Sequence, residues 1–545
     1  MGKIVEGADL ILVAGRIHTL DPARPHAQSV AIKDGVIIGV GDRTDVRDWR
    51  GSGTEVIDLG TATVTPGLVD GHSHPLVGAD MTEGVDLSAA STVGELIQAL
   101  RADGVAPDMG WIRGWGLDPN TFGTSPITYE PLIEALGESI PVYLSLNDGH
   151  SALVSPAALR LAGVTGHREF DQGARIVCDS AGRPTGHLLE PAAMDLVLAV
   201  VPVAPMSRRR HRVADILRGM AETGLTAANV MDFDGDSEEV ITGLAEEIEL
   251  PIQLRFAPRC HPGTGRAGLD HIVDLQRRGG RRWRVDGVKF VIDGTIDGGT
   301  AWLDEPDTLG QSTVPFWPEP AQYREAVHYL ASRGVPTVTH AIGDAGVRYA
   351  LETLKDAAPT TARHRIEHIE TIPNELVSKF REYGVVASMQ PTHCSHFTRA
   401  DHTDNWSSRL GDERANRGFR TRDLRDSGAT VALGSDWPIG PYDARAILAD
   451  AQLRRPAGRE DVDPVSPAQS LTAAMALEGY TTHAARAAGR ADSAGRVALG
   501  YRADLTAFTV DPLLAPPDEL AGAPIAVTVT EGAITHRADS SATRA

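Results

Sequence analysis

The most constraining feature of this chain is a pair of histidines, His72 and His74, that closes an apolar run from Thr63 to Val69. The run is typical of a buried strand, and alternate residues of a strand point to the same face. Both imidazoles are therefore expected on one side of the strand's end, where they could be two ligands of one metal ion. A polar strand end that only hydrogen-bonds its histidines would have the same short pattern, so the pair needs partners elsewhere.

Four later apolar segments each carry a charged or metal-competent residue, and each precedes a stretch long enough for a helix. These residues are Lys289, His340, His368 and Asp436. In a (β/α)8 barrel the carboxyl ends of the strands meet at one mouth, which holds the active site. The sequence therefore predicts an α/β fold of this type, a TIM barrel that gathers these residues and the histidine pair at one site.

The eight barrel strands are expected at 68–72, 226–231, 253–257, 288–292, 337–340, 365–368, 385–390 and 430–435. About 150 residues separate the first two, far more than one helix and its loops require. This excess predicts an insertion subdomain at about 80–215. Connections after a barrel strand emerge at the mouth, so the insertion is expected to cover the active site.

Six motifs follow one another in a characteristic order: Thr65-Pro66-Gly67-Leu68-Val69-Asp70-Gly71-His72-Ser73-His74, Val288-Lys289 with Asp293-Gly294, His340-Ala341-Ile342-Gly343-Asp344, Arg365-Ile366-Glu367-His368, Ser388-Met389-Gln390-Pro391 and Gly434-Ser435-Asp436-Trp437-Pro438. In them the chain resembles the metal-dependent amidohydrolase superfamily, and more narrowly its branch of YtcJ-like hydrolases and N-substituted formamide deformylase. The resemblance runs from about residue 7 to about residue 535. It implies a discontinuous β-sandwich from residues 1–65 and 491–545 beside a barrel at 66–490.

A binuclear metal centre is expected from these residues and from the resemblance. The two histidines of the first strand would share one divalent ion, and those of strands five and six a second. The expected ligands are His72, His74, Lys289, His340, His368 and Asp436. The resemblance implies that Lys289 is carboxylated and bridges the ions, although an unmodified lysine in a salt bridge stays open. Imidazole and carboxylate ligands favour zinc, with iron, manganese and cobalt left open.

Hydrolysis of a linear amide C–N bond is the expected reaction. A hydroxide that bridges two such ions exists near neutral pH, because a bound cation lowers the pKa of water to about 7. It would attack the carbonyl carbon, and Asp436 would take its proton and return it to the leaving amine. The alternative role of Asp436 is to cap the following helix. An N-substituted formamide or related amide is the expected substrate, on the resemblance alone.

Four residues outside the ligand set are candidates for substrate binding: Trp115, His150, His393 and Trp437. Aromatic and histidine side chains pack into cores at least as often, and an ordinary polar loop position is the alternative for His393. Glu367 precedes His368 on one strand, so alternation predicts that it points away from the site. Asp293 is expected to support loops by hydrogen bonds.

Composition narrows the partners and the location. With 52 basic and 73 acidic residues the net charge is −21, which repels nucleic acid and anionic membrane surfaces. Two basic runs, 208–212 and 277–282, are interpreted as solvated faces. Three scattered cysteines and the lack of a secretory signal favour the cytoplasm. We expect a small-molecule amide, no nucleic acid and no membrane as partners, and a homo-oligomer stays open.

Two other classes of function remain. A deaminase or hydrolase acting on a cyclic amide or amidine would use the same superfamily. Such a deaminase usually has His-x-x-Glu after strand five, but Gly343 stands three residues after His340, and Lys289 would be unused. A non-catalytic binding protein would have lost ligands, whereas all six candidates are present. A metal analysis and a hydrolysis assay would separate these classes.

Overall fold

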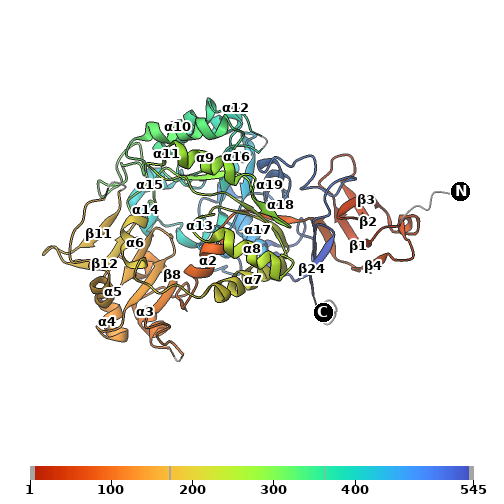
Figure 1. Cartoon of the computed structure of the whole chain (residues 1–545). Coiled ribbons are helices and arrows are strands. Elements are labelled where there is room, and N and C mark those ends of the chain that lie inside the picture. The colour runs from red at the N-terminus through yellow and green to blue at the C-terminus, as the bar shows by residue number, and fades with distance from the viewer. Residues whose placement is uncertain (1–6, 103, 171–172, 361, 539–545) are drawn as a thin grey trace.

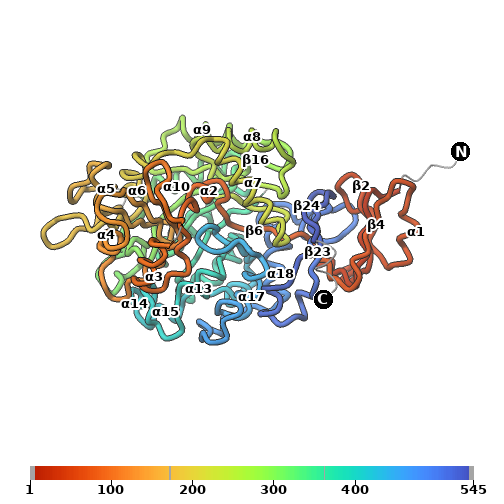
Figure 2. Tube along the Cα trace, turned by 90° about the horizontal axis from the view of Figure 1, so that it is seen from below, coloured from red at the N-terminus to blue at the C-terminus, as the bar shows by residue number. Residues whose placement is uncertain are grey.

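The computed structural model of the chain describes residues 7–102, 104–170, 173–360 and 362–538. Three parts follow one another along the long axis of the molecule (Figures 1 and 2). A sheet made from both chain ends lies at one end, and a sheet inserted after the first central strand lies at the other. Between them stand parallel strands surrounded by helices. This middle part carries most of the predicted site.

Both ends of the chain share one eight-stranded sheet. Thr63 pairs with Phe508 in antiparallel register and so joins the N-terminal strands to the C-terminal ones. The strands are β1 (Leu10–His18), β2 (His26–Lys33), β3 (Val36–Gly41), β4 (Glu55–Asp58), β5 (Thr63–Pro66), β22 (Leu505–Phe508), β23 (Ile525–Thr530) and β24 (Ala533–Arg537), with the short helices η1 (Arg43–Asp45), α1 (Val46–Trp49) and α20 (Pro517–Gly522). The description of this part as a sandwich, and its limits, stay predictions.

The segment after the first central strand contains a six-stranded sheet. Its strands are β7 (Val85–Asp86), β8 (Ile112–Leu117), β9 (Val142–Leu146), β10 (Ser151–Val154), β11 (Arg175–Cys178) and β12 (Pro184–Leu189), and its helices are α3 (Val93–Leu100), η2 (Pro119–Phe122), α4 (Glu130–Leu136), α5 (Pro156–Leu161) and α6 (Pro191–Leu198). Helix α3 begins at Thr92, whose hydroxyl accepts a hydrogen bond from the Glu95 backbone N–H. The loop after β9 contributes Asn147 and His150 to the wall of the main cavity.

The middle part consists of two five-stranded sheets in which every pair except β15 with β16 is parallel. Their strands are β6 (Leu68–Ser73), β13 (Leu225–Val230), β14 (Gln253–Phe256), β15 (Gly279–Gly280) and β16 (Trp283–Val285) in one sheet, and β17 (Val288–Val291), β18 (Thr337–Ala341), β19 (Arg365–His368), β20 (Val386–Met389) and β21 (Val431–Leu433) in the other. Most lie within two residues of the predicted strands. Strand β16 was not predicted; it is short, and its pairing with β14 and β15 reveals it.

Backbone hydrogen bonds join the two sheets at both edges. The Lys289 N–H donates to the Pro258 carbonyl at 2.8 Å on one side, and the Asp436 N–H donates to the His72 carbonyl at 2.7 Å on the other. At this second seam Gly71 has no room for a side chain, since a Cβ would lie 2.5 Å from the Leu433 carbonyl oxygen. The seam therefore holds the first and last parallel strands against each other, next to the predicted ligands.

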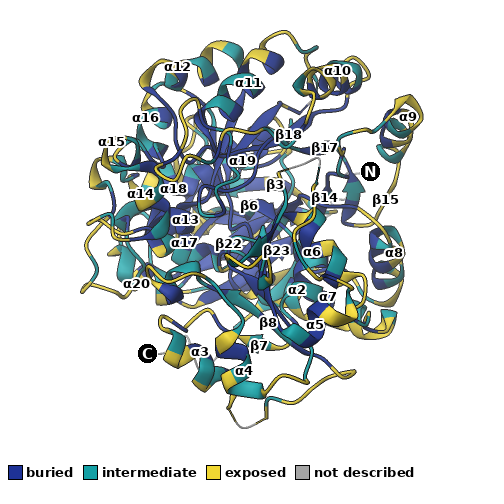
Figure 3. Cartoon of the chain, turned by 90° about the vertical axis from the view of Figure 1, so that its left-hand side faces the viewer, coloured by how far each residue is buried: buried dark blue, intermediate teal, exposed yellow. Residues whose placement is uncertain are grey.

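Helices surround these strands and bury one face each (Figure 3). They are α2 (Pro75–Met81), α7 (Met206–Glu222), α8 (Ser237–Glu247), α9 (Arg266–Leu275), α10 (Pro320–Ala331), α11 (Asp344–Lys355), α12 (Asn374–Tyr383), α13 (Pro391–Phe397), α14 (Asn405–Leu410), α15 (Asp412–Ala415), α16 (Thr421–Asp426), η3 (Pro467–Gln469), α17 (Ala444–Leu453), α18 (Ala473–Tyr480) and α19 (Thr482–Ala487). In α12 the buried side chains are Leu376 and Phe380, one turn apart. Each fully buried side chain of this size contributes about 1.5 to 3 kcal/mol to folding.

One arginine of the basic run 277–282 is buried. The sequence predicts a solvated face for this run, but Arg282 is 6% exposed. Its guanidinium donates to the Leu250 carbonyl at 2.6 Å and to the Thr530 carbonyl at 2.8 Å. A guanidinium can be buried when carbonyl oxygens accept hydrogen bonds from it, which the run of charges did not indicate.

Among the described residues, no helix combines the length and apolar character needed to cross a membrane.

Candidate metal centre

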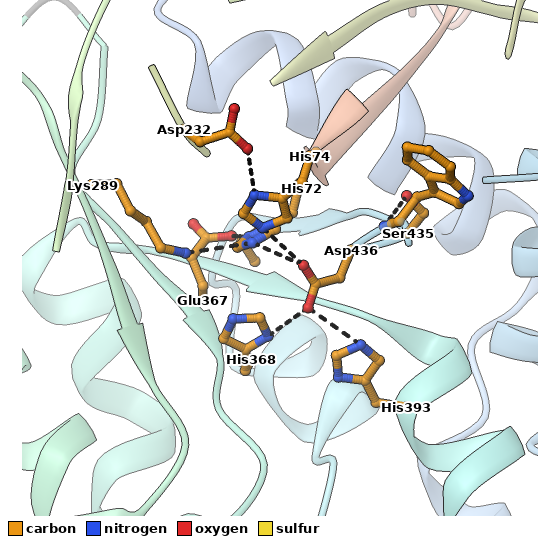
Figure 4. A network of polar contacts seen from close by, with 12 residues as sticks. His72, His74, Asp232, Lys289, Glu367, His368, His393, Ser435 and Asp436 are labelled. Carbon is orange, nitrogen blue, oxygen red and sulfur yellow. Dashed lines mark hydrogen bonds and ion pairs between the residues drawn. The ribbon is translucent and has the colours of Figure 1, made fainter. Parts of the chain in front are cut away.

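The six predicted ligands lie where the central strands end, and Figure 4 shows five of them, all except His340. His72 lies in β6 with His74 directly after it, Lys289 lies in β17, and Asp436 follows β21. His340 lies in β18 and His368 ends β19. The rings of these last two have centroids 4.5 Å apart, and those of His72 and His368 are 4.8 Å apart. Strands distant in sequence thus bring these side chains to one point.

Asp436 lies at the centre of the cluster. Its Oδ1 is 3.3 Å from His72 Nε2 and 3.2 Å from His74 Nε2, and its Oδ2 faces His368 Nδ1 at 3.8 Å. Burial alone would disfavour the charged carboxylate, but His72 and His74 hold the pKa of Asp436 well below its usual range. The φ of +56° places this residue in the left-handed region, which aspartate tolerates better than most residues. The Asp436 carboxylate therefore contacts histidines and does not cap a helix.

The direction of the Glu367 side chain differs from the prediction. Alternation predicts that it points away from the site, but its Oε2 lies 2.5 Å from His72 Nδ1. His368 has a φ of +73°, so the strand has ended and simple alternation no longer holds there. Arg365 donates to both Glu367 oxygens, at 2.8 and 3.0 Å. Although burial opposes it, this arginine and His72 hold the pKa of Glu367 far below its usual range.

Asp232 is a functional candidate that the sequence reasoning missed. Its Oδ2 lies 2.7 Å from His74 Nδ1, and its side chain is buried. Burial lowers the pKa of His74, but hydrogen bonds to Asp232 and Asp436 outweigh it and raise this pKa. A carboxylate behind a ligand histidine fixes the ring and its tautomer. The signal was present, because Asp232 follows the predicted second strand at its carboxyl end.

Lys289 is buried beside the histidines. Its Nζ lies 3.4 Å from His72 Nε2, and burial lowers its pKa to about 8. The described residues place no carboxylate within ion-pair distance of this amine, which disagrees with an unmodified lysine in a salt bridge.

The donor set fits divalent cations. Two groups of three side chains have ligand atoms within 4.8 Å of one another: His72, His74 and Asp436, and His368, His393 and Asp436. Buried ring nitrogens His368 Nδ1 and His393 Nε2 have no hydrogen-bond partner in the described part of the chain. Burial lowers the pKa of His368, so its ring stays neutral and keeps a lone pair for a cation.

His340 lies beside His368 but outside both groups of three, and its role as a ligand stays a prediction. Its Nε2 faces the Gly294 carbonyl at 3.4 Å, and burial lowers its pKa well below the usual range. The compact second group contains His393 where the sequence placed His340. His393 Nε2 lies 3.5 Å from Asp436 Oδ2 and its Nδ1 3.6 Å from Glu370 Oε1. Of the four substrate candidates, His393 is the one whose side chain faces the Asp436 carboxylate.

The cluster opens into a cavity of about 140 Å³. His150 and His393 line it, and burial and Glu190 act in opposite directions on His150, with a net pKa of about 9. Neither Trp115 nor Trp437 is among the described residues that line this cavity, which corrects that prediction. Trp437 instead packs against Gly78 of α2 and against the Tyr442 ring, and both tryptophans border a neighbouring hollow.

Asp293 supports a loop as predicted. Its carboxylate accepts backbone N–H groups of Trp302, Ile342 and Gly343 at 2.8 to 3.0 Å. Burial raises its pKa to about 7. These bonds hold the turn after β18, and thereby the position of His340.

Known proteins match the chain over most of its length. A model described as the amidohydrolase family matches residues 55–536. "Putative amidohydrolase YtcJ" of Bacillus subtilis (strain 168) is 28% identical over 96% of this chain and 98% of its own length. The N-substituted formamide deformylase of Arthrobacter pascens is 25% identical, over 97% of this chain and 98% of its own.

Solved structures agree on the fold. The crystal structure of an uncharacterised metal-dependent hydrolase from Pyrococcus horikoshii OT3 superimposes with a TM-score of 0.71 at 24% identity, covering 93% of this chain and 99% of that one. Its whole length is thus matched. Because the family model spans most of the sequence, the chain belongs to the amidohydrolase family.

Proposed function

We propose that this protein hydrolyses a linear amide, with N-substituted formamides as its substrate class. As a member of the amidohydrolase family it is a metal-dependent hydrolase of carbon–nitrogen bonds. The observation that carries the proposal is Asp436, whose two oxygens face His72 and His74 on one side and His368 and His393 on the other. The formamide class is supported by a deformylase relative that aligns over nearly the whole chain.

The scaffold in this proposal is a (β/α)8 barrel with a sandwich from both chain ends. Eight parallel strands, hydrogen-bonded at both seams, support the barrel. In such a barrel the strand ends converge without long loops, so the ligand positions are set by rigid backbone. The shared eight-stranded sheet supports the joint folding of the two ends.

Two divalent ions, preferably zinc, are proposed at the cluster. His72, His74 and Asp436 would hold one, and His340 and His368 with Lys289 the other, with His393 as a further donor. When bound, such a cation supplies Lewis acidity and lowers the pKa of water. Imidazole and carboxylate donors suit zinc, iron, manganese or cobalt in this geometry.

Carboxylation of Lys289 is part of the proposal. Because its pKa is about 8, roughly a tenth of the amine is neutral at pH 7. The neutral amine can add to carbon dioxide, forming an N–C bond and releasing a proton. The product is an anion in place of a cation, which suits a position between two metal sites. Arg365 already neutralises the charge of the nearby Glu367, so the negative charge of the carbamate would not face an unpaired carboxylate there.

Asp436 is proposed as the proton carrier of the reaction. Its low pKa keeps it ionised and ready to accept a proton from the attacking water. Its Oδ2 faces the cavity histidine His393, and its Oδ1 faces the first-strand pair. The proton would then pass to the leaving amine nitrogen as the C–N bond breaks, yielding a carboxylic acid and an amine. His150 and His393 would orient the carbonyl from the cavity wall.

A panel of N-alkyl and N-aryl formamides, with the matching acetamides and a cyclic amide, tests this proposal. Formate release with the metal-replete enzyme is expected to exceed acetate release and ring opening. The Asp436→Asn variant should lose formate release, whereas Glu352→Gln on an exposed face of α11 should keep it. Turnover of only the cyclic amide would contradict the linear substrate class.

A further inference from the structure

A groove lined with arginines lies on the other side of the central strands from the predicted metal ligands. It consists of two adjoining hollows that share Gly280, Trp283, Arg284 and Arg490. Val69, at the start of β6, borders it, whereas the histidines lie at the carboxyl end of the same strand. We call it the arginine groove. In folds of parallel strands and helices the chemistry sits at the carboxyl ends, so this groove has no part in the hydrolysis.

The charge of the groove opposes that of the whole protein. Seven arginines but only two carboxylates, Asp286 and Glu531, are among the described residues that line it. The chain as a whole carries a net charge of −21. A cationic hollow on such an acidic protein concentrates anions locally.

The carboxylates in the groove are already used. Asp286 Oδ2 accepts hydrogen bonds from Arg255 Nε at 3.1 Å and from Arg284 Nη2 at 2.5 Å. Arg282 is held by backbone carbonyls and Glu531, and Arg502 pairs with Asp504. Each of these arginines therefore has an anionic partner within the protein.

Arg490 differs from them. It borders both hollows and is half-buried, yet no side chain in the described part of the chain makes a hydrogen bond or ion pair with its guanidinium. Burial and the like charges of Arg284 and Arg502 lower its pKa to about 10. Gathering guanidinium groups away from bulk water is unfavourable unless an anion compensates them. The guanidinium of Arg490 can therefore accept an anion in the groove.

We propose that the arginine groove binds a phosphate group, either free or in a small phosphorylated molecule, through Arg490 together with Arg284 and Arg502. A guanidinium offers two parallel N–H groups that match two phosphate oxygens. Guanidinium groups from three different segments suit a tetrahedral dianion, whereas a single guanidinium is enough for a planar carboxylate. Trp283 forms an apolar floor beside them.

Such a ligand would link two parts of the molecule. Trp283 and Arg284 belong to β16 of the central sheet, and Arg490 follows α19. Arg502 lies three residues before the start of β22, in the sheet formed by the chain ends. A phosphate held by all three segments would tie them together and raise the unfolding temperature of the protein.

Isothermal titration of the full-length, metal-replete protein with inorganic phosphate tests the proposal at constant ionic strength. The control variant is Arg486→Gln, an exposed arginine four residues before Arg490. Wild type and Arg486→Gln are expected to bind phosphate equally, and Arg490→Gln at least ten-fold more weakly. Phosphate bound at the metal cluster would be unaffected by Arg490→Gln, so the difference reports the groove.

Further titrations identify the class of ligand. Arg490→Lys keeps the charge without the fork, and intermediate affinity supports the geometry even if Arg490→Gln does not fold. Tighter binding of glycerol 2-phosphate than of inorganic phosphate assigns the groove to phosphorylated molecules, and the reverse assigns it to the free ion. Phosphate binding that is absent from wild type, or equal in all variants, overturns the proposal. Equal binding of acetate overturns the choice of phosphate.

Discussion

His72 Nδ1 lies 2.5 Å from Glu367 Oε2, and both side chains are fully buried beneath the metal cluster. This contact assigns a proton of His72 to Nδ1, while Nε2 faces Asp436 Oδ1 at 3.3 Å and Lys289 Nζ at 3.4 Å. Arg365 holds Glu367 from the other side. Three buried groups in a row, Arg365, Glu367 and His72, therefore orient a predicted metal ligand, and the carboxylate also raises the basicity of this ligand.

Replacing Glu367 with glutamine should weaken metal binding. An amide can still touch His72, but it cannot match the charge of Arg365 or polarise the imidazole. Loss of such a partner typically lowers metal affinity about 10- to 100-fold. Competition with a fluorescent zinc chelator measures it, with Glu352→Gln as an exposed control that should bind zinc as wild type does. Equal affinities for the two variants would show that the contact does not tune the site.

The same carboxylate should make stability depend on acid pH. Its folded pKa is depressed below the ordinary value of 4.5 by Arg365 and His72, against the opposing effect of burial. Glu367 therefore stabilises the fold above this pH, and the contribution is lost as the pH falls below it. Relative to Glu367→Gln, wild type should lose about 1 to 3 kcal/mol of unfolding free energy between about pH 5 and about pH 3.

Urea unfolding at several pH values measures this difference. Both proteins are treated with chelator first, because metal release also depends on acid. Parallel stability curves for the two proteins would contradict the assignment of the low pKa to Glu367.

The lysine prediction separates carbamate from ammonium. Lys289→Ala should lose one metal ion per chain and nearly all turnover, because the proposed carbamate anion is lost. Acetate or propionate, which are small enough to enter the vacated place, should restore part of both. Lys289→Arg restores charge without a bridging anion and should not respond to the acids.

Metal content by elemental analysis and turnover, each with and without the added acid, provide the measurements. Full metal loading by Lys289→Ala without any acid would contradict a bridging role. Wild-type mass spectrometry under carbon dioxide gives an independent check on the modification.

Strand patterns predicted much of this molecule and much of its site. His72, Lys289 and Asp436 could be placed together because each lies in or soon after a short apolar strand, and parallel strands bring such residues to one edge. The contact of Glu367 with His72 could not be predicted, because His368 leaves the extended conformation with a φ of +73°. Strand alternation describes regular backbone only, and it fails where a strand ends at a site.

Other differences come from side-chain packing. Trp437 follows Asp436 directly, yet its indole fills the space over Gly78, where a Cβ would collide with the ring. His393 has no strand to position it, and its place beside Asp436 depends on the short helix α13 after β20. Such positions depend on how helices pack on strands, which a single sequence indicates only weakly.

The last prediction concerns proton transfer by Asp436. Asp436→Asn keeps the shape and one oxygen that can still face the histidines, but it removes the basic carboxylate. Turnover of the formamide substrate should fall by a factor of about 100 or more, as expected for loss of general acid–base catalysis. KM should change less, because the side chain acts when the proton moves and not when the substrate binds.

His393→Gln is the matched comparison, since its ring nitrogen lies 3.5 Å from the same carboxylate. It should lower turnover less than Asp436→Asn does, because the carboxylate remains to accept the proton. Steady-state kinetics of both variants with measured metal content decide between the two residues. Near-normal turnover in metal-replete Asp436→Asn, together with a large loss in His393→Gln, would move the proton-carrying role to the histidine.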